Sequence, residues 1–196
     1  MQARAFLFDL IFMAKIIGKK IIHCKEINST NDEARRLIKK GVGEGAVIIA
    51  DRQTKGRGKP GSVWFSPPGV GVYLSAVIKP FKNPKDLAPI TGLGARAVVS
   101  TIKKMAGLEP KVKPPNDVLL NGKKLCGVLV EGLASGYLII GIGININNPI
   151  SSFPEEIRNS ATSLKIESNK SFDIQEFADI LVSELDKEYL AYLARI

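Results

Sequence analysis

Short apolar runs bounded by glycine, asparagine and proline recur along the chain and predict six strands. They are residues 19–27, 45–51, 71–78, 111–118, 123–131 and 137–144. Asn121 with Gly122, and Ser135 with Gly136, separate the last three runs. Asn-Gly between two apolar runs is a strong hairpin signal, so we expect tight turns between these three strands.

Helical spacing of apolar residues predicts three helices. The first follows Ser29 directly, because Thr30 with Glu33 fits a capping box. The other two are residues 83–106 and 173–193. Strands and helices do not alternate regularly along the sequence. The predicted fold class is therefore α+β, a mixed β-sheet with helices packed on it.

The composition is that of a globular protein with one core. The chain has 196 residues, of which 45% are hydrophobic and 24% charged. Cys24 and Cys126 have neither the spacing of a metal site nor a disulfide pattern. No secretory signal is recognisable, so the reducing cytoplasm is the expected location.

The net charge of +9, from 28 basic and 19 acidic residues, favours anionic partners such as phosphates, nucleic acid or an acidic protein. The basic residues occur mostly as scattered pairs. Aromatic residues do not interleave with them, as they often do in a nucleic-acid groove. We therefore expect no DNA partner and rank nucleic-acid binding last among the functions considered.

The first fourteen residues, MQARAFLFDLIFMA, are apolar but too short to span a membrane, and no cleavage site follows them. An amphipathic helix is one interpretation. We favour another, in which residues 1–14 are a dispensable extension, Met13 is the natural start and one domain covers residues 15–196. No membrane partner is expected.

The loop at residues 53–64, QTKGRGKPGSVW, alternates three glycines with three cations. Glycine lets the backbone approach a ligand and turn its N–H groups inward, and the cations supply charge for a phosphate. Trp64 ends the loop, and its indole face suits stacking on a purine. The loop is not a P-loop. A solvated turn ending in a core tryptophan explains the same residues equally well.

Four other polar positions lie where predicted elements begin or end. Residues 29–31, Ser-Thr-Asn, open a helix, where hydroxyls cap the helix or hold a ligand oxygen. Asn116 and Asp117 follow two prolines, and the Asp117 carboxylate suits Mg²⁺. Lys124 opens an apolar strand, and Asn145 ends one with an amide that matches the edge of adenine. Taken singly, each is explained better as a cap, a polar turn or an exposed lysine.

Taken together and in this order, the segments resemble the catalytic domain of biotin protein ligases. The family pattern is Ser-Thr-Asn, a GRGR-type loop ending in Trp, KWPND, KKxxG[IV]LVE and GxGxN. The matching segments are residues 29–31, 56–64, 113–117, 123–131 and 141–145. The resemblance runs from about Ile21 to Leu193. It implies that residues 15–196 form one catalytic domain of the α+β type shared by biotin and lipoate ligases.

The resemblance also implies an activity and a set of site residues. Biotin would be activated with ATP to biotinyl-5′-AMP and transferred to a lysine of a biotin carboxyl carrier protein, with Mg²⁺ as cofactor. The residues expected to bind biotin are Ser29, Thr30, Asn31, Gln53, Gly56, Arg57, Lys124 and Gly127. Those expected to bind ATP are Gly58, Lys59, Trp64, Asn116, Asp117 and Asn145. The catalytic cations would be Lys124, Arg57 and Lys59, and Asp117 is the candidate metal ligand.

The chain departs from the family pattern at three positions. Lys59 replaces the second arginine of GRGR, Ser62 replaces a further arginine, and Pro114 replaces the tryptophan of KWPND. Lysine keeps the charge but lacks the bidentate fork of arginine. We expect neither the N-terminal DNA-binding domain nor the small C-terminal domain of other members, so a repressor role is not implied. A homodimer is compatible with the resemblance.

Two alternatives stay open at this point. A lipoate or octanoyl ligase or transferase would share the fold, although such relatives carry an Arg-Arg followed by a Gly-Gly-Gly run, and the sequence has no Gly-Gly-Gly run. A relative that binds biotin or nucleotide without turnover would explain the substitutions at Lys59, Ser62 and Pro114. Labelled biotin and lipoate distinguish the first alternative, and pyrophosphate release distinguishes the second.

Overall fold

The computed structural model describes residues 15–81 and 84–195, and one seven-stranded sheet organises them. The strand order is β1-β2-β3-β7-β6-β5-β4, in which β1 and β2 are parallel and all other neighbours are antiparallel. The strands are β1 (Lys20–Ile27), β2 (Ala46–Gln53), β3 (Gly71–Ile78), β4 (Lys111–Lys113), β5 (Asp117–Leu120), β6 (Lys123–Gly132) and β7 (Leu138–Asn145). The segment predicted to be dispensable, residues 1–14, lies outside the described residues.

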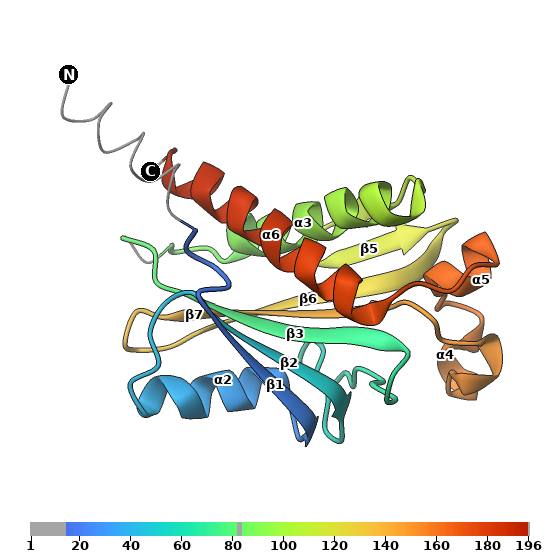
Figure 1. Ribbon diagram of the computed structural model, residues 1–196, viewed down its shortest axis with the longest axis horizontal. Helices are drawn as coiled ribbons and strands as arrows, with labels where there is room; N and C mark the ends of the chain where they lie inside the picture. The colour runs from blue at the N-terminus through green and yellow to red at the C-terminus, as the bar shows by residue number, and fades with distance from the viewer. Residues whose placement is uncertain (1–14, 82–83, 196) are drawn as a thin grey trace.

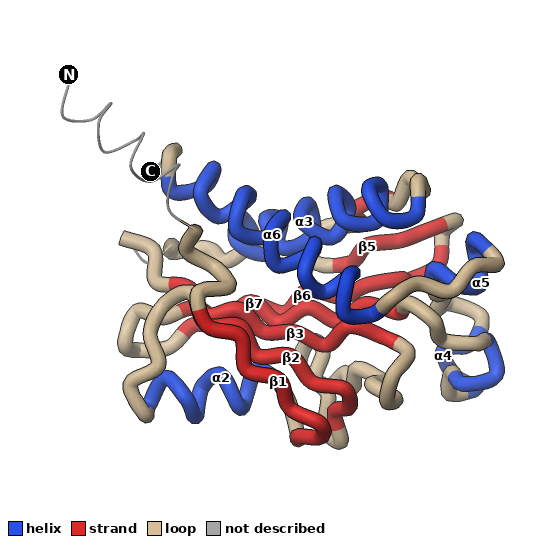
Figure 2. The backbone as a smooth tube through the Cα atoms, viewed as in Figure 1, coloured by secondary structure: helices blue, strands red, loops and turns tan. Residues whose placement is uncertain are grey.

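Helices pack on both faces of the sheet (Figure 1), so the predicted α+β class is confirmed. Helices α3 (Ala88–Ala106) and α6 (Ile174–Leu193) lie side by side on one face, and α2 (Thr30–Lys39) lies on the other. Between β7 and α6 the chain forms a 3-10 turn (Ile150–Ser152) and the short helices α4 (Glu155–Arg158) and α5 (Leu164–Ser168), visible as the separate group beyond the end of the sheet in Figure 2. No described helix is long and apolar enough to cross a membrane.

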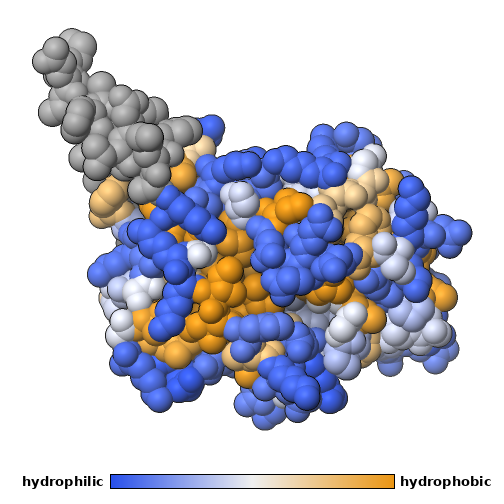
Figure 3. Space-filling view, in the orientation of Figure 1, coloured by the Kyte–Doolittle hydropathy of each residue, from blue (hydrophilic) through white to orange (hydrophobic). Residues whose placement is uncertain are grey.

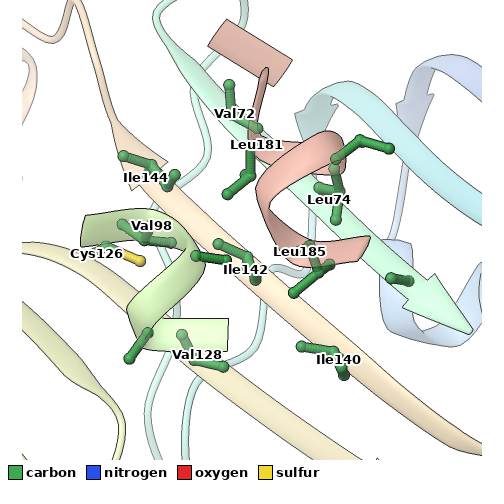
Figure 4. Packing of buried hydrophobic residues seen from close by; sticks show 14 of the residues in the cluster. Val72, Leu74, Val98, Cys126, Val128, Ile140, Ile142, Ile144, Leu181 and Leu185 are labelled. Carbon is green, nitrogen blue, oxygen red and sulfur yellow. The ribbon is translucent and has the colours of Figure 1, made fainter. Parts of the chain in front are cut away.

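The main core lies between the sheet and the α3–α6 pair (Figure 4). Alternate residues of β3 and β7, such as Leu74 and Ile142, meet Leu181 of α6 there. Gly94 of α3 allows a close approach, because a Cβ at this position would lie 2.9 Å from Val128 Cγ1. Such tight packing fixes the strands and therefore the residues that point to the other face.

The opposite face carries less apolar cover. A small cluster under α2 consists of Ala34, Ala46, Ile48, Val77 and Ile139. Beyond the N-terminus of α2, the loop between β2 and β3 covers the sheet instead of a helix. This leaves room for a cleft over β5, β6 and β7.

The face that carries α6 shows apolar surface in its middle, with polar side chains around it (Figure 3). A hollow beside α6 is lined by Ile49, Val72, Ile174 and Ala178. His23 and Asp51 also border it, with His23 Nε2 lying 2.7 Å from Asp51 Oδ1. None of the predicted site residues lines this hollow, so it is separate from the cleft described below.

The strand predicted at residues 111–118 is instead two strands, which corrects the sequence interpretation. Strands β4 and β5 form an antiparallel hairpin in which Lys113 pairs with Asp117. Pro114 and Pro115 lie in the turn between them. Proline has no N–H to donate to a strand ladder, so two in succession interrupt the strand.

One predicted helix start and one predicted helix cap were also wrong. Helix α3 begins at Ala88 rather than at residue 83, and Pro89 occupies its first turn, where a missing N–H costs nothing. Helix α2 does begin beside Ser29, but no side chain caps it. The Thr30 hydroxyl donates to Gln53 Oε1 at 3.1 Å instead of forming the predicted capping box. Helices α4 and α5 were not predicted.

Candidate functional site

A cleft opens on the α2 face of the sheet, at the N-terminus of α2. Its volume is about 110 Å³, and it opens to solvent. The first turn of α2, the loop between β2 and β3, and strands β5, β6 and β7 form its walls. All but two of the predicted site residues line it: Ser29, Thr30, Asn31, Gln53, Arg57, Gly58, Lys59, Trp64, Asn116, Asp117, Lys124 and Gly127.

The two predicted residues that do not line the cleft are Gly56 and Asn145. Gly56 is buried within the loop itself, where a Cβ would come within 2.4 Å of the Trp64 carbonyl oxygen. Asn145 is buried, and its Nδ2 donates to the Thr162 carbonyl at 2.9 Å. The amide of Asn145 is thus engaged by the segment that leads to α5.

The cleft also has lining residues that were not predicted as site residues: Ser62, Val63, Val128, Leu129, Gly141, Ile142 and Gly143. Gly141 and Gly143 are the most informative of these, because two glycines spaced by two residues in a strand leave one face bare at both positions. That spacing within GIGIN was a signal available from the sequence.

The floor of the cleft is bare backbone. Gly127 of β6 pairs with Gly143 of β7, and the Trp64 indole lies over both. A Cβ at Gly127 would lie 3.2 Å from Trp64 Cζ3, and one at Gly143 would lie 2.3 Å from Nε1. The indole Nε1 is buried without a hydrogen-bond partner among the described residues. Because buried donors are normally paired, this N–H is available to an acceptor atom of a ligand.

A β-bulge brings Lys124 and Gly127 to the same face of β6. The pairing with β5 shifts register here, so that Leu125 is skipped. Leu125 and Cys126 are both fully buried in the main core. Residues three apart on a regular strand point to opposite faces, so the bulge is what places Lys124 beside the cleft. Burial raises the pKa of the Cys126 thiol well above its usual range and keeps it protonated.

Lys124 is the cation nearest to the floor of the cleft. Its Nζ lies 2.8 Å from Asp117 Oδ1 and 5.7 Å from the centroid of the Trp64 ring. Its backbone N–H donates to the Ser160 carbonyl at 2.7 Å, which fixes the strand at this point. Lys123, in contrast, is exposed and does not line the cleft.

A chain of hydrogen bonds runs along the α2 end of the cleft. Ser75 Oγ lies 2.7 Å from Thr30 Oγ1 and 2.5 Å from Asn31 Oδ1, and its single proton can serve one of them at a time. Gln53 Oε1 accepts from the Thr30 backbone N–H at 2.8 Å. Gln53 Nε2 then donates to Ser66 Oγ at 2.9 Å. These groups are buried or half-buried, so the chain holds each of them in one orientation.

Two carboxylates hold Arg57. Its Nη1 donates to Asp32, and its Nη2 lies 2.8 and 3.0 Å from the two oxygens of Glu131. Asn31 Nδ2 donates to Glu131 at 2.7 Å, and Arg35 Nη2 lies 3.3 Å from the same carboxylate. Burial lowers the pKa of Arg57, but the hydrogen bonds and charges of Asp32 and Glu131 outweigh it and raise that pKa. Neither carboxylate was among the residues predicted for the site.

Known proteins resemble this chain in both sequence and structure. The profile of the Biotin/lipoate A/B protein ligase family matches residues 24–147. The bifunctional ligase/repressor BirA of Bacillus spizizenii is 36% identical over 183 residues, which is 91% of this chain and 56% of that protein. The biotin–[acetyl-CoA-carboxylase] ligase of Mycobacterium tuberculosis is 31% identical over 153 residues, or 76% of this chain. The chain thus spans 56% of the length of these curated relatives.

A solved structure shares the fold. The biotin protein ligase from Aquifex aeolicus, in complex with biotin and ATP, superposes with a TM-score of 0.79 at 34% identity. The superposition covers 90% of this chain and 72% of that one. That protein thus combines the same arrangement of sheet and helices with bound biotin and ATP.

Proposed function

The chain belongs to the Biotin/lipoate A/B protein ligase family, and from this we propose that it activates biotin with ATP and transfers it to a carrier lysine. The intermediate would be biotinyl-5′-AMP, and the acceptor a biotin carboxyl carrier protein. One observation carries the proposal: segments far apart in sequence, each matching a motif of the family, meet in one cleft. The biotin and ATP bound to the similar Aquifex aeolicus protein support the choice of substrates.

The cleft suits the two ends of biotin differently. Ser29, Thr30 and Gln53 offer hydroxyl and amide groups at the α2 end, where a ureido ring needs both donors and acceptors. The Trp64 ring, which packs on the bare backbone of Gly127, would offer its surface to the body of the ligand. Lys124 would then meet the carboxylate, which must give up part of its hydration to react.

The chemistry requires charge neutralisation. A biotin carboxylate oxygen attacks the α-phosphorus of ATP, the bond to pyrophosphate breaks, and a mixed anhydride forms. Both reacting groups are anionic, so cations fixed beside them lower the barrier. Lys124 and Lys59 are the two lysines among the lining residues. The carrier amine then attacks the biotinyl carbonyl carbon, and AMP leaves with the electron pair of the broken C–O bond.

We further propose that Mg²⁺ enters with the ATP phosphates. Among the described residues, no group of three or more His, Cys, Asp or Glu side chains could hold a metal ion. Asp117 and Asn116 nevertheless offer oxygen ligands in the cleft. Mg²⁺ usually takes one or two carboxylates and completes its shell with substrate phosphates and water, so the residues present fit it. The ion would supply additional positive charge at the phosphates.

Pyrophosphate release tests the proposal most directly. Purified protein with biotin, ATP and Mg²⁺ should release pyrophosphate, and added carrier domain should become labelled on its lysine. The control replaces biotin with lipoate or octanoate, which should release little. Release with lipoate but not with biotin would support the lipoate alternative, and binding of biotin without any release would mean a protein that does not turn its substrates over.

We place the activity in the cytoplasm, where the free thiols of Cys24 and Cys126 stay reduced.

Trp64 provides a direct reporter for ligand binding, because it is the only tryptophan in the chain. Adenine stacking on the indole, or any ligand on the glycine floor, must change the surroundings of the ring. We expect a saturable change in tryptophan fluorescence when biotin and ATP are added together. Titrations with each ligand alone are the controls. An unchanged spectrum at saturating biotin and ATP would contradict the placement of the nucleotide against Trp64.

A further inference from the structure

We propose that Glu131 and Asp32 are positioning residues that act through Arg57 to hold the glycine-rich loop, residues 54–64, closed over the cleft. The catalytic consequence rests on the proposed function, whereas the closed position of the loop does not. This assigns Arg57 to anchoring the loop, and leaves the charge at the phosphates to Lys59 and Lys124.

The tip of the loop is held together by its own hydrogen bonds. Gly58 N–H donates to the Ser62 carbonyl at 3.0 Å, and Trp64 N–H donates to the Gly56 carbonyl at 3.0 Å. Arg57 and Val63 face each other as an antiparallel backbone pair between these two bonds. A hairpin fastened in this way moves as one body, so a single anchor on Arg57 controls the position of Trp64.

The Arg57 guanidinium reaches two separate elements. Asp32 belongs to the first turn of α2, and Glu131 lies near the end of β6. Both ends of the guanidinium are thereby occupied, so it cannot turn to a phosphate without giving up one of these carboxylates. Arg57 together with Arg35 balances the charge of the two carboxylates, and the cluster is neutral.

This cluster is more than a surface ion pair. Isolated exposed pairs contribute little, and the Arg57 and Asp32 side chains are 36% and 46% exposed. Glu131, however, is only 23% exposed and also accepts a hydrogen bond from Asn31, which is buried at 3%. Charge-assisted hydrogen bonds in such a shared network are the stronger kind.

Asn31 joins the anchor to the cleft. Asn31 donates to Glu131 with its Nδ2, and its Oδ1 lies beside Ser75, which also contacts Thr30. Glu131 therefore couples the loop to the residues proposed to bind the ureido ring. A closed loop would keep water away from the mixed anhydride until the carrier lysine arrives.

The test that needs no ligand is acrylamide quenching of Trp64 fluorescence in Glu131→Gln and Asp32→Asn. Each variant removes one charged partner of Arg57, which should raise the ratio of open to closed loop by about tenfold and increase quenching accordingly. Glu33→Gln is the matched control. Glu33 lies on the same helix as Asp32 and pairs with Arg36 rather than with the loop. Its substitution should leave quenching unchanged.

The test with substrates separates anchoring from catalysis. In single turnover with biotin and ATP, Glu131→Gln should release several-fold more biotinyl-5′-AMP into solution per carrier labelled. If Arg57 acts as an anchor, Arg57→Gln gives the same phenotype, and the double variant is no worse than either single one. Losses that multiply in the double variant would instead mean independent roles and would overturn the proposal.

The outcomes distinguish the two proposals. Unchanged quenching in both Glu131→Gln and Asp32→Asn overturns the anchoring role, whatever the activity of the protein. Increased quenching in these variants supports the anchoring role even if the unaltered protein releases no pyrophosphate, and in that case the proposed function is the part refuted. Asp32→Asn also guards against misfolding, because Asp32 is half-exposed and its substitution leaves the sheet untouched.

Discussion

Lys124→Ala should slow adenylate formation by about two to three orders of magnitude, the largest catalytic effect we expect from one substitution. The Lys124 ammonium lies 2.8 Å from Asp117 and beside the Trp64 ring, at the junction proposed for carboxylate and α-phosphate. Loss of one fixed electrostatic contact of this kind costs about 3–4 kcal/mol of transition-state stabilisation. The Asp117 carboxylate would also lose its cation and face the phosphates directly, which adds to the effect.

Lys123→Ala is the matched control for this prediction. Lys123 has the same charge and length, lies one residue away, and pairs with the core-side residue Leu120 instead of lining the cleft. Rapid-quench measurement of biotinyl-5′-AMP in a single turnover separates this step from transfer. Equal rates for Lys124→Ala and the unaltered protein, or a greater loss for Lys123→Ala, would show that the ammonium has been assigned to the wrong lysine.

Gly141→Ala should lower the free energy of unfolding by about 2–4 kcal/mol. A Cβ at Gly141 would lie 2.4 Å from Asn31 Oδ1. Asn31 cannot move aside freely, because it is buried and both ends of its amide are engaged. Its Nδ2 donates to Glu131, and its Oδ1 lies beside the Ser75 hydroxyl. The methyl group must either strain the sheet or break a buried hydrogen bond.

Gly132→Ala provides the comparison for Gly141→Ala. Gly132 ends the neighbouring strand β6, and a Cβ there would meet only Leu138 Cδ2, at an ordinary contact distance of 3.5 Å. We expect its unfolding midpoint in urea to stay close to that of the unaltered protein. If Gly141→Ala proves as stable as Gly132→Ala, the hydrogen-bond network beside the cleft is looser than its geometry indicates.

The parts of the fold that follow local patterns could be predicted from the sequence. Strand β3 was predicted at its observed bounds, because an apolar run between glycine and proline signals it without reference to any partner. Helix α6 was predicted to within one residue, since Asp173 caps it and apolar residues recur at helical spacing. The cleft itself was predicted through motif segments, although nothing local says that they meet.

The parts that depend on tertiary contacts could not be predicted. Thr30 looked like half of a capping box, but its hydroxyl bonds to Gln53, which is distant in sequence. The glycine-rich loop was expected to offer Arg57 to a ligand, whereas two carboxylates from other elements hold it. Helices α4 and α5 are too short to show a period, and they are fixed by contacts such as the bond from Lys124 N–H to the Ser160 carbonyl.

The bulge in β6 decides which side chains of this strand face the cleft. Lys124 and Gly127 are separated by an odd number of steps, yet both must stand on the same side, and a regular strand cannot satisfy that count. A regular strand without the bulge would turn the charged Lys124 toward the core and expose Leu125, which is otherwise fully buried. Exposing that leucine alone costs about 1.5–3 kcal/mol, so the order of one lysine and one leucine is enough to keep the strand irregular. When two residues of one strand must share a ligand and their spacing in the sequence is odd, the sequence itself therefore indicates a bulge between them.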